Sequence, residues 1–111
     1  MIVAAALLAL ASASAAPPPA SVADAARAMN ACIDGLYFQA EAGVRAEVAA
    51  ASIVEYCQPQ TSAYAAAYEQ WIAGSTMSDR EKARQRRVLR NELSGQRARI
   101  AARIRAERRR R

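Results

Sequence analysis

Residues 32–57 are CIDGLYFQAEAGVRAEVAAASIVEYC, and this stretch begins and ends with the only two cysteines of the chain. Gly43 stands close to its midpoint, where a turn between two helices is expected. In an antiparallel helical hairpin, residues equidistant from the turn lie opposite each other, so the two sulfurs can meet. The stretch therefore predicts a helical hairpin pinned by a Cys32–Cys57 disulfide. On the chain-entropy account, closing a loop of this length stabilises the fold by about 3.5 kcal/mol.

Helical periodicity continues on both sides of the predicted turn. Ser21 stands three residues before Asp24, as in a capping box, and opens a first helix that should end near Gly43 in a left-handed cap. Its apolar residues recur every three or four positions, namely Val22, Ala26, Met29, Ile33, Leu36 and Ala40. A second helix is expected from about Arg45 to Cys57, and the Gln58-Pro59 pair should end it.

A short aromatic helix is predicted next, over residues 63–73, with Thr61 or Ser62 as its cap and Gly74 at its end. One face of it carries Tyr64, Tyr68, Trp71 and Ile72. This face either packs on the hairpin or forms an aromatic ligand-binding surface. Packing is favoured, because the chain has few other large apolar residues and much of its 53% hydrophobic content is alanine.

The C-terminal part is predicted to form one long basic amphipathic helix. Ser78 and Glu81 have the S-x-x-E spacing of a capping box, and Leu89, Leu93, Ile100 and Ile104 form a narrow apolar stripe. Residues 1–79 contain two basic and seven acidic residues, whereas residues 80–111 contain fourteen basic and three acidic ones, so the net charges are −5 and +11. The two ends of the chain therefore have opposite charge.

Three interpretations of this basic segment remain open. It can bind phosphate-rich surfaces such as anionic lipid or lipopolysaccharide, or it can bind nucleic acid by charge alone. Alternatively, it is a solvated helix folded against the acidic N-terminal half. The candidate residues for an anionic-surface site are Arg97, Arg99, Arg103, Arg105, Arg108, Arg109, Arg110 and Arg111.

The N-terminal residues have the pattern of an export signal. An uncharged apolar run over residues 2–11 is too short to cross a bilayer, and small-residue triplets follow it. Pro17 disfavours cleavage after Ala16, so the cut is placed after Ala15, with Ala13 as the alternative. The absence of Lys and Arg before the apolar run leaves open a soluble alanine-rich helix. The predicted organisation is a signal peptide over residues 1–15, a proline-rich spacer over 16–20, a helical domain over 21–78 and the basic helix over 79–111.

The residue types that catalysis needs are scarce in this sequence. There is no histidine, no Gly-rich phosphate loop and no G-x-S-x-G or H-E-x-x-H motif. The cysteines lack the C-x-x-C spacing of redox pairs, and without histidine a zinc site lacks ligands. We therefore expect no enzyme activity, no metal and no cofactor, and a structural role for the disulfide.

The chain resembles a group of short exported helical proteins of Gram-negative bacteria. The resemblance rests on Cys32 and Cys57, on the segment AEVAAASIVEYC and on the arginine-rich terminal helix. The resemblance extends loosely over residues 30–111. It implies a periplasmic or secreted location and one disulfide, and no activity. The expected function is that of a non-enzymatic binding module whose C-terminal arginines contact the anionic envelope, with nucleic acid a disfavoured partner in that compartment. The alternative is a structural or stress-related periplasmic protein without a specific ligand.

Overall fold

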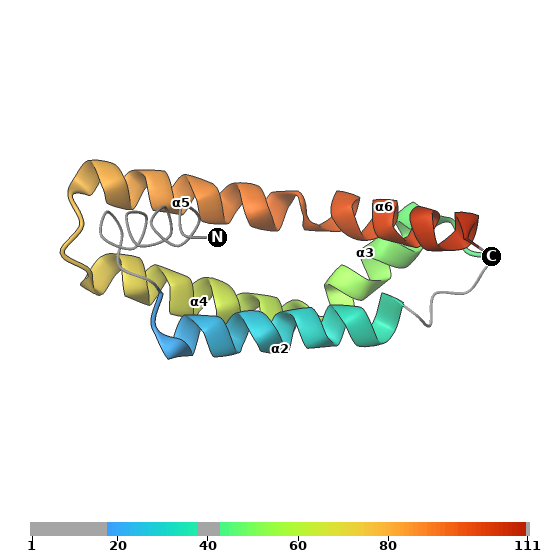
Figure 1. Ribbon diagram of the computed structural model, residues 1–111, viewed down its shortest axis with the longest axis horizontal. Coiled ribbons are helices and arrows are strands. Elements are labelled where there is room, and N and C mark those ends of the chain that lie inside the picture. The colour runs from blue at the N-terminus through green and yellow to red at the C-terminus, as the bar shows by residue number, and fades with distance from the viewer. Residues whose placement is uncertain (1–17, 38–42, 111) are drawn as a thin grey trace, which may run out of the picture.

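The computed structural model describes residues 18–37 and 43–110, and in this part the chain forms five helices and no strands (Figure 1). The helices are α2 (Ala20–Tyr37), α3 (Ala46–Tyr56), α4 (Gln58–Gly74), α5 (Asp79–Ser94) and α6 (Gln96–Arg109). The predicted all-α class is confirmed. The predicted signal peptide, over residues 1–15, and Arg111 lie outside the described residues. The predicted end of the first helix near Gly43 depends on residues 38–42, which also lie outside them.

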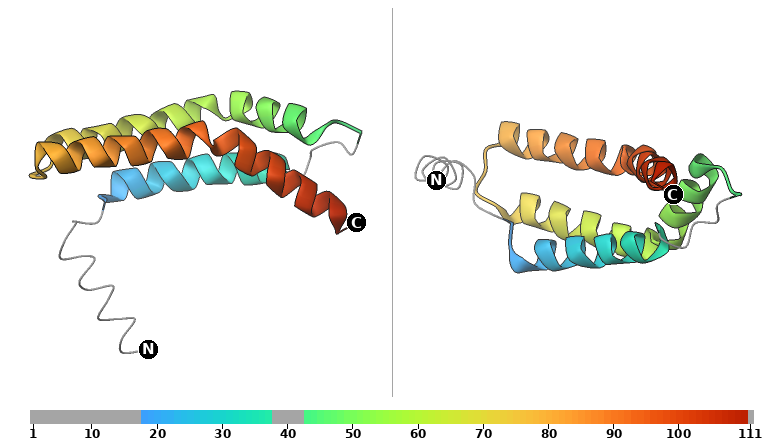
Figure 2. Two further views of the ribbon diagram at one scale, coloured as in Figure 1. Left: turned by 90° about the horizontal axis from the view of Figure 1, so that it is seen from above. Right: turned by 45° about the vertical axis from the view of Figure 1, so that its right-hand side comes forward.

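The helices pack in two pairs that differ from the predicted hairpin. α2 lies antiparallel to α4, its main partner, and α3 packs mainly on α6 (Figures 1 and 2). α5 runs along α4, and α2 makes only a smaller contact with α3.

The disulfide predicted between Cys32 and Cys57 is present, with an S–S distance of 2.11 Å and Cα atoms 6.0 Å apart. Cys57 is the single residue between α3 and α4, and it is completely buried. The bridge therefore joins the middle of α2 to the corner at which α3 passes into α4.

The second helix ends at Tyr56, just before the Gln58-Pro59 pair, as the sequence predicts, and Pro59 also begins the next helix at this corner. It stands in the first turn of α4, where its missing N–H group would have no helical partner in any case. The expected cap at Thr61 or Ser62 is wrong, because α4 already begins at Gln58 and the Thr61 N–H donates to the Cys57 carbonyl at 3.0 Å. The predicted end of this helix at Gly74 is confirmed.

The predicted long basic helix is divided into α5 and α6 at Gly95. The guanidinium of Arg99 reaches back and donates to the Glu92 carbonyl in the last turn of α5. A Cβ atom on Gly95 would lie 2.6 Å from Arg99 Nη1, so glycine leaves room for this contact. A side chain inserted at a main-chain carbonyl is a known cause of helix kinks, and it accounts for the change of direction seen in Figure 2.

The core contains a few large side chains packed among alanines. Ala46, Ala49 and Ala50 of α3 and Ala101 of α6 are buried, which lets these two helices approach closely. Leu89, Ile100 and Ile104 from the predicted apolar stripe are also buried in this core, and Leu93 packs partly against it. The stripe therefore belongs to the interior of the domain.

The aromatic face of α4 also packs inside. Tyr64 and Ile72 are buried, and Tyr68 and Trp71 are partly buried. Tyr68 makes edge-to-face contacts with both neighbours, at ring-centroid distances of 5.8 Å to Tyr64 and 5.3 Å to Trp71. This supports the interpretation of the aromatic face as core, since these rings are used within the fold.

Candidate functional site

Some arginines of the basic segment join α6 to the first two helices. Arg103 Nη1 donates to Asp34 Oδ1 at 2.6 Å, and the guanidinium carbon lies 4.0 Å from the centroid of the Tyr37 ring. The hydrogen bond that Arg103 donates to the Asp34 carboxylate raises the pKa of Arg103, so its charge is further secured. Tyr37 Oη in turn donates to Glu107 Oε2 at 3.2 Å. α2 and α6 are therefore connected by two polar contacts around one ring.

Arg105 makes the matching contact to α3, where its guanidinium forms an ion pair with the Glu47 carboxylate. The pKa of Glu47 is lowered, first by a hydrogen bond from its own backbone amide and then by the charges of Arg105 and Arg45. Glu47 lies in the first turn of α3, where the helix dipole also favours a negative charge. Arg105 thus adds a polar contact to the alanine-lined interface of α3 and α6.

A second polar seam connects α4 to α5. Tyr64 Oη donates to Glu92, at 2.9 Å from Oε2, and Arg86 Nε donates to Glu69 Oε1 at 2.7 Å. Tyr68 Oη is 2.9 Å from Gln85 Oε1. Burial raises the pKa of Tyr64, and the hydrogen bond to the Glu92 carboxylate raises it further. The hydroxyl therefore stays protonated and remains a donor over the ordinary pH range.

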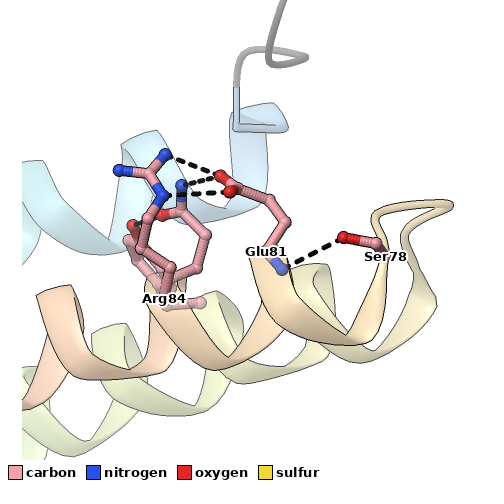
Figure 3. A network of polar contacts seen from close by, with 5 residues as sticks. Ser78, Glu81 and Arg84 are labelled. Atoms are coloured by element: carbon pink, nitrogen blue, oxygen red, sulfur yellow. Dashed lines mark hydrogen bonds and ion pairs between the residues drawn. The ribbon is translucent and has the colours of Figure 1, made fainter.

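The start of α5 is capped by Ser78, as the sequence predicts (Figure 3). Ser78 Oγ accepts a hydrogen bond from the Glu81 N–H at 3.1 Å. The Glu81 carboxylate does not complete the box, because it accepts bonds from Arg84 Nε and Nη2, at 2.9 and 2.6 Å, and from Gln85 Nε2 at 3.1 Å (Figure 3). These bonds lower the pKa of Glu81 to about 2. Arg84 is therefore neutralised by a neighbour on its own helix.

Another group of arginines faces solvent on the side of α5 opposite the core. We call Arg80, Arg87 and Arg90 the outward arginine row; all three are exposed, and none contacts a carboxylate or another acceptor among the described residues. They fall within about 80° of the circumference of α5, away from the buried Leu89. At 1.5 Å per residue, Arg80 and Arg90 are separated by about 15 Å along α5.

The predicted anionic-surface residues fall into several environments. Arg103 and Arg105 pair with acidic residues of α2 and α3, while Arg99 is bonded to the Glu92 carbonyl. Arg110 Nη1 is 3.8 Å from Glu107 Oε2, and Arg108 also interacts within the molecule. Arg97 and Arg109 are exposed and unpaired in the described part of the chain, and Arg111 lies outside it.

The prediction concentrated on residues 97–111 and left out Arg80, Arg87 and Arg90. The signal that could have found them is their recurrence at seven and three positions on the face opposite Leu89. By contrast, Arg103 and Arg105 are neutralised because the fold brings Asp34 and Glu47 close to them. The helical periodicity of the sequence does not show where these acidic residues lie in space.

Acidic, cysteine and histidine side chains are the ones that could hold a metal ion. Within residues 18–37 and 43–110, no group of three or more of these side chains is arranged to do so. In the same ranges, none of the helices has the length and apolar character of a membrane span.

No protein-family model, curated protein or solved structure matches the chain.

Proposed function

We propose that this protein is an exported, non-enzymatic binding module that attaches to anionic surfaces of the bacterial envelope through its outward arginine row. The observation that carries the proposal is this row of exposed guanidiniums without acidic partners on α5, whose other two arginines, Arg84 and Arg86, are each paired with a carboxylate within the fold. The periplasmic or secreted location rests on the sequence pattern of residues 1–15 and on the disulfide, which persists in oxidising compartments.

Charge, rather than insertion of apolar side chains, supplies the binding free energy in this proposal. Leu89, Ile100 and Ile104 are used in the core and are not offered to a lipid bilayer. A basic residue close to an anionic membrane contributes about 1 kcal/mol, so the three arginines of the row supply about 3 kcal/mol together. Binding of this kind is screened by salt, because the Debye length falls from about 30 Å at 0.01 M to about 8 Å at 0.15 M ionic strength.

A second candidate is a structural or stress-related periplasmic protein without a specific ligand. It is favoured by the pairing of Arg86, Arg103 and Arg105 with acidic residues of three other helices. In that case the basic composition mainly neutralises the acidic N-terminal half. The two candidates differ in the role of the outward arginine row, which has no such internal function.

Sedimentation with lipid vesicles tests the proposal. The oxidised protein is mixed with vesicles containing phosphatidylglycerol or with neutral phosphatidylcholine vesicles, at ionic strengths of about 0.05 and 0.3 M. We expect binding to the anionic vesicles only, and a steep loss of binding at the higher salt concentration. A triple variant R80Q/R87Q/R90Q should bind about a hundredfold more weakly than the native protein.

The matched control is R86Q/R103Q/R105Q, which removes the same charge from arginines that face the fold. Circular dichroism melting is measured on both variants, so that loss of folding is recognised. We expect less than about a tenfold loss of vesicle binding in this control, since these guanidiniums are already neutralised. Equal losses in the two variants, or equal binding to neutral vesicles, would favour the second candidate.

A further inference from the structure

A cleft lies between α2 and the junction of α5 and α6, and no residue of the outward arginine row lines it. Its volume is about 270 Å³. Met29 and Ile33 from α2 and Ile100 from α6 line it, and all three are buried, so they form an apolar floor. A cavity of this size is slightly smaller than the pockets that enclose drug-sized ligands. It is therefore suited to a short apolar body.

Two guanidiniums also line the cleft, those of Arg99 and Arg103. Both residues are exposed, unlike the apolar floor, and so lie at its mouth. Arg99 is held by the Glu92 carbonyl and Arg103 by Asp34 and the Tyr37 ring, which fixes their positions. Since a guanidinium has five N–H donors, each arginine keeps donors for a further acceptor.

Gln96 gives an independent reason to expect a polar ligand group. This side chain lines the cleft, although only 6% of the residue surface is exposed. Its Nε2 donates to Met29 Sδ at 3.5 Å, and a thioether is a weak acceptor. Within the described residues, no other hydrogen bond of this side chain is formed. The amide oxygen of Gln96, which has no hydrogen-bond partner, is not sealed from solvent, so this side chain can bond to a ligand in the cleft.

Glu92 is the acidic residue of the cleft lining, and its carboxylate is already used elsewhere. It accepts contacts from Tyr64 Oη at 2.9 and 3.2 Å, on the side of α4. Asn30 and Gln96 add amide groups, each of which has both donors and an acceptor. The charged groups of the lining that remain open to a ligand are the two guanidiniums, because the Glu92 carboxylate is bonded to Tyr64. A ligand that matches them has an acceptor group with negative charge.

We propose that this cleft binds a small amphiphilic monoanion, a carboxylate on a short alkyl body such as a medium-chain fatty acid. The carboxylate accepts hydrogen bonds from Arg99, Arg103 and the Gln96 amide, and the alkyl part lies over Met29, Ile33 and Ile100. The proposal is separate from the vesicle-binding function, because it uses none of the residues of the outward arginine row.

Methyl NMR of the oxidised protein, labelled with ¹³C-methyl methionine, tests this proposal with octanoate as the probe. Met29 lies in the cleft, whereas Met77, in the turn between α4 and α5, lies outside it and serves as the internal control. The M77L variant assigns the signals. We expect a saturable shift of the Met29 methyl signal with a Kd on the order of 1 mM, and no shift of Met77. Octylammonium and octanol, with the same alkyl chain, should shift Met29 much less.

The variant R99Q should weaken octanoate binding about tenfold, as expected for one lost charge-assisted hydrogen bond. The matched control is R97Q, which removes the same charge from an exposed position two residues away that does not line the cleft, and it should change the affinity less than about twofold. Q96L should weaken binding and change the melting temperature little, because the only hydrogen bond that it removes within the described residues is the weak one to Met29 Sδ. A purely structural Gln96 would lower the melting temperature without an effect on binding.

Several outcomes would overturn the proposal. They are the absence of a Met29 shift at octanoate concentrations of about 10 mM, an equal shift of Met77, and an equal response to octanol or octylammonium. Equal weakening by R97Q and R99Q would also overturn it, since the charge of the whole surface would then account for the effect.

Discussion

The guanidinium of Arg103 lies over the ring of Tyr37, with its Cζ atom 4.0 Å from the ring centroid. The same side chain forms an ion pair with Asp34 in the same helix as Tyr37, one turn earlier. A cation–π contact at an exposed site contributes about 0.5–1 kcal/mol, and a surface ion pair at most about 1 kcal/mol. Together they hold α6 on α2, where few apolar side chains are shared.

Replacing Arg103 with glutamine should lower the free energy of unfolding by about 1 kcal/mol. The effect should shrink in high salt, because about half of the Arg103 side chain is exposed and its ion pair is screened. Urea denaturation at two salt concentrations measures this. Arg90→Gln removes an unpaired arginine and is the control, for which we expect a change below about 0.5 kcal/mol. Equal destabilisation by both variants would mean that the Tyr37 contact contributes nothing.

Reduction of the Cys32–Cys57 bridge should lower the free energy of unfolding by about 3.5 kcal/mol, given the loop of 25 residues that it closes. The total free energy of unfolding of a small domain is about 5–10 kcal/mol, so the reduced protein should be close to unfolding at room temperature. Thermal melts with and without reductant measure the loss. The double variant C32A/C57A is the control, and it should melt near the reduced protein and be insensitive to reductant. An unchanged melt in reductant would show that the bridge contributes no stability.

Stability should fall at alkaline pH because of Tyr64. Its pKa is raised in the folded protein, so the unfolded chain loses the proton near pH 10 while the folded chain keeps it. The stabilisation is therefore complete below about pH 10 and is lost as the pH rises above that value. Tyr64→Phe should flatten this dependence, as measured by urea denaturation at about pH 8 and 11. Tyr56→Phe is the control, because Tyr56 is 71% exposed, and it should leave the pH dependence as in the native protein.

The junction at Gly95 can be tested with a double-mutant cycle. Alanine is about 1 kcal/mol better than glycine inside a helix, but its Cβ atom would displace Arg99 from the Glu92 carbonyl. We expect Gly95→Ala to stabilise the R99A variant by about 1 kcal/mol and the native protein by less. Thermal or urea unfolding of the four proteins gives the coupling. If the two substitutions are additive, Arg99 is not responsible for the break between α5 and α6.

The sequence predicted the parts of the fold that depend on local patterns. The cysteine spacing identified the bridge, and the S-x-x-E motif identified the start of α5 at Ser78. Local patterns could not decide the role of Pro59, because proline is excluded from helix interiors but accepted in the first turn. Nor could they reveal the break at Gly95, since it arises from the reach of Arg99 to Glu92.

The sequence located the basic segment that contains the candidate site, but it could not show which of its arginines form ion pairs within the fold. All arginines of residues 80–111 contribute equally to the net charge of the segment. In the fold, three of them form ion pairs with Asp34, Glu47 and Glu69, and the arginines of the outward row do not. These acidic residues come from three helices that are distant in sequence from α6 or α5. The pairing of α2 with α4 was also missed, because local sequence patterns do not specify which helices contact each other.

The outward arginine row has one consequence for the conditions in which the protein can work. Guanidinium groups remain charged under all conditions in which proteins are folded, and the chain contains no histidine that could add or remove charge near neutrality. Under the proposed function, a change of pH around neutrality therefore gives no means of releasing the protein from an anionic surface. Ionic composition, including divalent cations that compete for the same phosphates, would then govern its binding to that surface.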